Sequence, residues 1–318
     1  MTRYVTGRIL QAIAVLWAAY TVAFAVLYLL PSNPVELQLA AAGVDPGSLP
    51  PAQLHAEEAK FGLDQPMIVQ YFDHLGGFLH GNLGTSITQD IPVTQVIGNR
   101  LGSTLLLSLV AGVVALIAGT TLAYLATYVG VKPLRLFLTR LPAFGASLPQ
   151  FLTGLFLIQF LSFKLDWLPA SGQQGWQSLV MPAITIALVT GSLLAQVLMR
   201  SFQEVMRQPY IITARAKGLS RGAVQLRHGL RNAALPALTI LGVIAGLTVT
   251  SSVVVETEFN RQGIGNLTQQ AVSTQDIPVV LAIVMIAAAL FVVINLIVDL
   301  LYPLLDPRIS HYAKAAQA

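Results

Sequence analysis

Six long apolar runs dominate this chain and restrict it to folds that cross a membrane. They cover residues 9–30, 101–128, 134–162, 178–200, 234–255 and 278–302. A helix of about 20 apolar residues matches the hydrocarbon thickness of a bilayer. Hydrophobic residues make up 55% of the 318 and charged residues only 10%, whereas a soluble domain carries about 25% charged residues. The sequence therefore predicts an all-α integral membrane protein with six transmembrane helices.

The first run follows Arg3 and Arg8 and so has the charge pattern of a signal peptide. A secretory hydrophobic region has about 7–15 residues. Residues 9–30 form a longer run, which leads into LYLLPSNP without a small-x-small cleavage site. We therefore expect residues 1–30 to form an N-terminus and a retained first transmembrane helix.

The distribution of lysine and arginine predicts the orientation, because basic residues near membrane helices stay in the cytoplasm. Six spans place both termini on one side. All but four of the 18 lysines and arginines then fall on that side, the exceptions being Lys60, Arg100, Lys164 and Arg261. We expect a cytoplasmic N-terminus, a cytoplasmic loop at 201–233 within the helical core 101–305, and a cytoplasmic tail at 306–318.

The segment 31–100 then lies outside the membrane and is too long to be a simple turn. Two stretches in it, QLHAEEAKF and PMIVQYFDHLGGFL, are typical of helices. Gly62 and Gly81 follow them and suit helix C-termini. The sequence predicts a small, acidic extracytoplasmic cap between the first two transmembrane helices.

The chain lacks the residues and motifs that are typical of ion-coupled carriers and of membrane enzymes. An ion-coupled carrier needs ionisable groups at membrane depth, yet the central parts of five runs have almost none, and Asp299 in the sixth lies near its cytoplasmic end. The chain has no cysteine and no H-E-x-x-H, G-x-S-x-G or Walker A motif, which are marks of metal sites, hydrolases and ATPases. We expect no catalytic residue, metal site or bound cofactor in this chain.

The fifth run carries the candidates for a polar translocation path. Gly242, Gly246 and Thr250 recur every four residues, and such small residues let helices pack closely in lipid. The hydroxyl-rich TVTSS at 248–252 adds Ser251, and Glu256 follows at the outer end. Packing within the bundle and lining of a path both remain open on the residues alone, as do a structural role and a substrate-facing role for Glu256.

The cytoplasmic loop contains a patterned basic stretch, YIITARAKGLSRGAVQLRHGLRNAALP at 210–236. A short helix is expected to end at Gly218, and Ser220 is placed to cap a second helix. Such a knob suits docking into a groove of a cytoplasmic partner. A solvated basic loop that contacts anionic lipid is the alternative. The candidate docking residues are Tyr210, Thr213, Ala214, Arg215, Ala216, Lys217, Gly218, Leu219, Ser220 and Arg221.

This stretch resembles the EAA loop of ABC-importer permeases, which binds the ATPase subunits. The peptide-importer version commonly has R-T-A-x-A-K-G-L, and TARAKGL at 213–219 matches it. Ile212 and Pro209 depart from the pattern, but the alanine–glycine core is intact.

Further segments are similar to the same family in the same order along nearly the whole chain. They are FGLDQP at 61–66, GNLGTS at 81–86, WLPASG at 167–172, MPAITIAL at 181–188, ETEFNRQGIGNL at 256–267, QDIPVV at 275–280 and VDLLYPLLDPRIS at 298–310. The chain resembles the B-type permease subunits of the dipeptide/oligopeptide/nickel ABC importer family, and dipeptide permeases most of all.

The resemblance implies a type I ABC-importer permease fold in the bacterial cytoplasmic membrane, with no affinity for nucleic acid. It implies three kinds of protein partner: a paralogous C-type permease in a heterodimer, ATP-binding subunits or domains that hold ATP and Mg²⁺, and an extracytoplasmic substrate-binding protein. The implied substrates are dipeptides or oligopeptides, while relatives also handle haem or nickel chelates. A secondary transporter is the remaining alternative, and it would show buried ionisable groups and inverted repeats.

Overall fold

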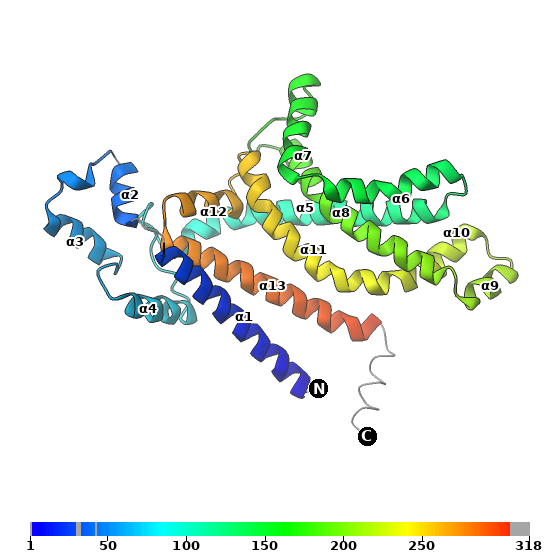
Figure 1. Cartoon of the computed structure of the whole chain (residues 1–318), viewed down its shortest axis with the longest axis horizontal. Helices are drawn as coiled ribbons and strands as arrows, with labels where there is room; N and C mark the ends of the chain where they lie inside the picture. The colour runs from blue at the N-terminus through cyan, green and yellow to red at the C-terminus, as the bar shows by residue number, and fades with distance from the viewer. Residues whose placement is uncertain (1, 30–32, 42, 306–318) are drawn as a thin grey trace. The chain divides into compact units, whose positions relative to one another are not determined.

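The computed structural model of the chain describes residues 2–29, 33–41 and 43–305 (Figure 1). In this part every regular element is helical, apart from an isolated bridge between Thr85 and Pro92. The chain divides into two compact units. Unit 1 comprises residues 1–104 and 262–292, and unit 2 comprises residues 105–261 and the chain from 293 onward. The expected tail at 306–318 lies outside the described residues.

Among the described residues, five helices are long and apolar enough to cross a membrane; four of them contain a whole predicted run, and the first contains the run 9–30 as far as Tyr28. They are α1 (Thr2–Tyr28), α5 (Val93–Tyr128), α8 (Gln177–Val205), α11 (Arg231–Glu258) and α13 (Ile277–Leu305). The second of them, α5, begins at Val93, inside the segment expected to belong to the cap.

The remaining run, 134–162, does not form a straight span. It is split into α6 (Lys132–Ser147) and α7 (Gln150–Leu157), which continues as the π-helical segment η2 (Ile158–Lys164). The two parts are bent by 102°. The break falls at Leu148, whose extended backbone fits the restriction that a following proline imposes. A sixth span therefore exists only if this bent pair counts as one, so the number six stays a prediction.

The segment 31–100 begins with short helices. These are α2 (Pro34–Ala41), the 3-10 turn η1 (Pro46–Ser48), α3 (Pro51–Lys60) and α4 (Met67–Leu79). The two helices expected from the sequence are α3 and α4, and Gly62 and Gly81 follow them with φ of 68° and 77°.

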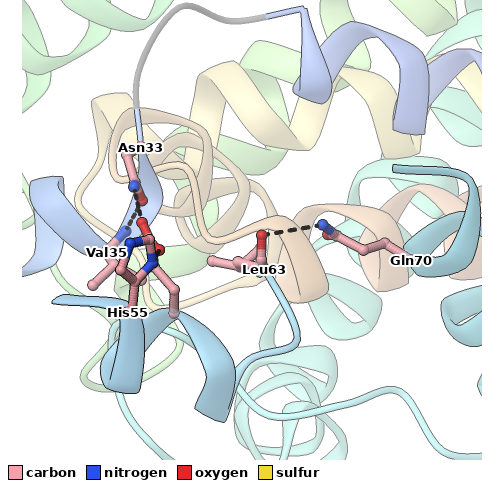
Figure 2. Close-up of polar contacts among 6 residues, drawn as sticks. Asn33, Val35, His55, Leu63 and Gln70 are labelled. Carbon is pink, nitrogen blue, oxygen red and sulfur yellow. Dashed lines mark hydrogen bonds and ion pairs between the residues drawn. The ribbon is translucent and has the colours of Figure 1, made fainter. Parts of the chain in front are cut away.

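Figure 2 shows how polar side chains tie these short helices together. Asn33 accepts from the backbone amide of Val35 at 3.0 Å and donates to Glu58 Oε1 at 2.6 Å. Gln70 donates to the carbonyl oxygen of Leu63 at 3.3 Å. A pocket of about 150 Å³ lies among Asn33, Glu58, Gln70 and their neighbours.

Unit 1 has its own hydrophobic core, against which the cap packs through α4 and through Leu63, Leu83 and Ile91 of its loops. Tyr20 and Phe24 of α1 are buried there, together with residues at the start of α5 and α13 and with Leu267 and Ala271 of α12 (Ile264–Ser273). Tyr20 donates a hydrogen bond of 2.8 Å to the carbonyl oxygen of Tyr71 in α4. Neither η1 nor α3 has a buried residue, so these two elements add little to the core.

A buried carboxylate joins two distant loops of unit 1. Asp276, which is 1% exposed, precedes α13 and accepts four hydrogen bonds from the turn at 86–88. The donors are Ser86 Oγ at 2.5 Å, Ile87 N at 3.1 Å, Thr88 N at 3.2 Å and Thr88 Oγ1 at 2.8 Å. These bonds compensate the loss of water around the charge.

Unit 2 is organised around α8, whose buried face carries small residues at its closest contacts. A Cβ atom on Gly119 of α5 would lie 2.7 Å from the carbonyl oxygen of Gly191 in α8. A Cβ on Gly145 of α6 would overlap Ser192 of the same helix. Because such contacts leave no room for a side chain, glycine permits the close approach of helices that lipid does not drive together.

Candidate coupling and translocation sites

The predicted docking stretch forms two short helices separated by a tight turn. The first is α9 (Pro209–Ala216), and the second is α10 (Arg221–Val224). Gly218 has φ of 84°. This conformation is unfavourable for any residue that carries a Cβ atom. Ser220 caps α10 by accepting a hydrogen bond of 3.3 Å from Ala223 N. The expected turn at Gly218 and cap at Ser220 are both confirmed.

The docking residues do not all face outward. Tyr210, Thr213, Arg215, Ala216, Lys217, Gly218, Ser220 and Arg221 are exposed, and Leu219 is half-buried. Ala214 is buried against Ile211 and Val224, so its side chain packs within the chain, and its part in docking stays a prediction. Ala214 lies one turn from Ile211, and this inner face of α9 packs within the chain. Ile212, which is 70% exposed, lies on the outer face instead.

We call α9, α10 and the π-helical segment η3 (Gln225–Leu230) that follows them the knob. Gln225 is the first residue of η3, is 1% exposed and anchors the second half of the knob to the end of α5. Its Nε2 donates to the carbonyl oxygen of Tyr124 at 3.0 Å and to Thr127 Oγ1 at 2.5 Å. Gln225 thus adds a donor to a carbonyl oxygen and a hydroxyl group in the last two turns of α5.

Arg221 makes a second contact with the same end of α5. Its guanidinium donates to the carbonyl oxygen of Thr127 at 3.3 Å and lies 5.6 Å from the centre of the Tyr128 ring. That ring stacks on Tyr124. Part of the charge in this basic stretch therefore holds the knob to a membrane helix.

Two further contacts join the knob to α8 and α11. Gly229 of η3 packs against Phe202 of α8, and a Cβ atom added there would lie 3.2 Å from the ring. Asn232, at the start of α11, donates to Tyr210 Oη of α9 at 3.1 Å. The knob is thus fixed to the ends of three long helices, α5, α8 and α11.

The structure separates the five residues predicted for a translocation path. Gly242 is buried, Gly246 is half-buried and Thr250 is exposed. Ser251 accepts a hydrogen bond of 2.9 Å from Gln150 Nε2 of α7. The exposed face of α11 consists instead of residues three or four positions apart, namely Val243, Leu247, Thr250, Val254 and Thr257. The recurrence of glycine indicated the packing face, which is why the prediction found only Thr250 on this exposed stripe.

Glu256 is fully buried, so a substrate-facing position is wrong for it in this conformation. Its charge acts on Arg261, which is itself 3% exposed. Arg261 donates to the carbonyl oxygen of Ser178 at 3.1 Å. Burial lowers the pKa of Arg261, and the Glu256 carboxylate opposes that shift. The pair joins the outer end of α11 to the start of α8.

The sequence does not predict the surroundings of two further residues. A single glutamine in a basic loop, Gln225, does not show its contacts. Glu258 ends α11, and both its carboxylate oxygens are buried. Among the described residues, no group of three or more histidine, aspartate or glutamate side chains is placed to hold a metal ion.

The comparisons with known proteins agree with this architecture. Residues 113–311 match the family described as binding-protein-dependent transport system inner membrane component. Residues 1–108 match the N-terminal domain of such membrane components. Together the two matches cover nearly the whole chain.

Similar curated proteins include the glutathione transport system permease protein GsiC of Salmonella typhimurium strain LT2, 36% identical over 313 residues, which are 98% of this chain and 100% of that protein. The protein of the same name from Escherichia coli strain K12 is 34% identical over the same shares. A crystal structure of an amino acid ABC transporter with histidines matches with a TM-score of 0.52 and 17% identity. That match covers 66% of this chain and 94% of the other, and it shows the fold alone.

The similar proteins are permease subunits, which are not enzymes themselves, and the apolar helices agree with a multi-pass inner-membrane location. The chain therefore belongs to the binding-protein-dependent transport system inner membrane components and is a permease subunit of an ABC importer of the peptide type.

Proposed function

We propose that the chain forms half of the translocation path of an ATP-driven importer for short peptides, with dipeptides, oligopeptides and the tripeptide glutathione as the substrate class. The similar proteins are named for glutathione transport, which supports a substrate with peptide bonds and a free amino group. The other half of the path would be a paralogous C-type permease.

The observation that carries this proposal is the knob made of α9, α10 and η3. Its outer face, with Ile212, Arg215 and Lys217, is exposed and unused within the chain. Its inner face is fixed to α5, α8 and α11 through Gln225, Gly229 and Asn232. An ATPase subunit that grips the outer face would move three membrane helices together. ATP and Mg²⁺ belong to that subunit, because this chain offers no phosphate-binding motif.

The exposed stripe of α11 is the surface that we assign to the path. Thr250 and Thr257 supply hydroxyl groups there, while Val243, Leu247 and Val254 supply apolar contacts. Such a surface suits peptides with varied side chains, because it carries no charged group that would select side chains of one charge. On the outer side, the cap would receive the substrate-binding protein, and both termini would lie in the cytoplasm.

The mechanism is alternating access by rigid-body rocking of the two permeases. Closure of the ATPase subunits would push the knobs together, and the helices tied to each knob would turn as one body. The path would then open outward to receive substrate from the binding protein. ATP hydrolysis and separation of the ATPase subunits would return it to the inward-open form.

The test is uptake by the complete importer in proteoliposomes. We expect peptide accumulation that requires ATP inside the vesicles and persists when a protonophore removes the pH gradient. Uptake that follows an imposed pH gradient without ATP would contradict the proposal and favour a secondary transporter.

A further inference from the structure

Glu256 and Glu258, at the outer end of α11, have different surroundings. The charge of Glu256 acts on Arg261. The two carboxylate oxygens of Glu258 are buried and accept no hydrogen bond. The backbone of Leu155 in α7 lies beside this carboxylate. A buried carboxylate without a partner is costly, so its presence here calls for a reason.

Gly154 of α7 makes room for this carboxylate. The Glu258 side chain lies where the Cβ atom of any other residue at position 154 would be. Gly154 is itself buried. The backbone of α7 therefore lies directly on the carboxylate and shields it from water, without neutralising it.

The connection between α7 and the rest of unit 2 suits a movable cover. The 102° break at Leu148 and Pro149 separates α7 from α6 and provides a place to pivot. Gln150 and Ser251 form a side-chain hydrogen bond between α7 and α11. Other positions of α7 are exposed, with Phe151, Leu155 and Phe156 all more than half exposed.

Glu258 also lies next to the exposed stripe of α11. It follows Thr257, the last residue of that stripe, and successive residues of an α-helix are about 100° apart around the axis. A small displacement of α7 would therefore add a carboxylate to the side of the surface assigned to the path.

We propose that Glu258 binds the α-ammonium group of the peptide during transport, after α7 has moved off it. The proposal rests on the peptide-import function, and it names the group of the substrate that this chain recognises. A carboxylate and an ammonium group form a charge-assisted hydrogen bond, which is stronger than a bond between neutral groups. The unfavourable free energy of the unpaired Glu258 carboxylate in the covered state is then offset when the substrate binds.

The first test is the uptake kinetics of the complete importer, with glutathione and tri-alanine as probes, since each carries one free α-ammonium group. Glu258→Gln should raise the KM for both probes about tenfold or more while the maximal rate changes little, the pattern expected when ground-state binding is lost. Glu258→Asp, which keeps the charge, should restore part of the affinity. Glu204→Gln makes the same chemical change at an exposed carboxylate of α8 and should behave as wild type.

Glu258→Gln with a wild-type KM would overturn the proposal, since it would show that the charge is not used. Loss of the partner permease on co-purification of Glu258→Gln would overturn it too, because the cation would then belong to that subunit. Neither result would contradict the proposed function, because that function is tested by ATP-driven uptake in the wild-type complex.

A second test follows the cover itself. The chain contains no cysteine, so Glu258→Cys places its only thiol under α7. In nanodiscs, a cationic methanethiosulfonate reagent should modify this thiol at different rates in the nucleotide-free and ATP-trapped complexes, with the mass of this subunit as the readout. Glu204→Cys should be modified at one rate in both. Equal rates at position 258 in the two states would contradict the movement of α7.

Discussion

Gly218 and Ala214 lie four residues apart in the coupling knob and are constrained in different ways. Gly218 is exposed and has φ of 84°, so its constraint is in the backbone. Ala214 is buried against Val224, so its constraint is in the space for its side chain. A small residue is required at both positions, but only the first requirement is visible from the local sequence.

We expect Gly218→Val to strain the turn by about 1–2 kcal/mol, because a β-branched residue tolerates the left-handed conformation poorly. The membrane helices are untouched, so insertion should be normal. Co-purification with the ATPase and peptide uptake should both fall. Arg227→Ala, at an exposed position of η3, is the control. Full assembly and full uptake by Gly218→Val would show that the knob is not the docking site.

The elements of the knob are held to the membrane helices by few but specific contacts. Gln225 and Arg221 reach the end of α5, Gly229 rests on Phe202 of α8, and Asn232 reaches Tyr210 from α11. Each contact involves the end of a long helix that borders the knob. Force applied to α9 therefore has several routes into unit 2.

Gln225→Leu tests the route through α5. The change keeps most of the side-chain volume but removes the hydrogen bonds to the carbonyl oxygen of Tyr124 and to Thr127 Oγ1, at a cost of about 0.5–1.5 kcal/mol each. We expect the ATPase to bind and hydrolyse ATP while the number of peptides imported per ATP falls. Gln203→Leu, at an exposed position on α8, should leave that ratio unchanged. An unchanged ratio in Gln225→Leu would remove α5 from the coupling route.

At the scale of the whole molecule, unit 1 combines the cap with parts of α1, α5 and α13. Tyr71, Leu75 and Phe78 of α4 pack against its core, whereas η1 and α3 bury no residue. A polar contact between Asn33 and Glu58 ties α3 to the start of α2. The cap can therefore be divided into a part that stabilises unit 1 and a part that is free for another role.

Replacing residues 43–61 by a short glycine–serine linker should remove η1 and α3 without disturbing the core of unit 1. We expect normal insertion, normal assembly and normal basal ATP hydrolysis. Stimulation of the ATPase by liganded binding protein should require a higher concentration of that protein. Removal of residues 67–79 is the contrast, because loss of α4 should destabilise unit 1 itself. Normal stimulation after replacement of 43–61 would mean that α3 does not meet the binding protein.

Sequence patterns predicted the features that depend on neighbouring residues. The apolar runs indicated the long helices, and glycine and serine indicated the turn at 218 and the cap at 220. Features that depend on distant contacts were missed or misplaced. Ala214 turned out to face inward and Glu256 turned out to be buried, because contacts with Val224 and Arg261 come from other elements. The bend at Pro149 was missed because hydropathy continues through it.

The π-helical segment η3 has a consequence for how this chain can vary in length. A π-helical turn contains about one residue more than an α-helical turn, and η3 runs directly from α10 into α11. Deleting one residue between 226 and 230 would remove this extra residue and let an ordinary helix form, so Gln225 would keep nearly its present direction toward α5. The same deletion in a regular α-helix would rotate everything before it by about 100°. We therefore expect η3 to tolerate the loss of one residue better than the α-helical part of α11 does.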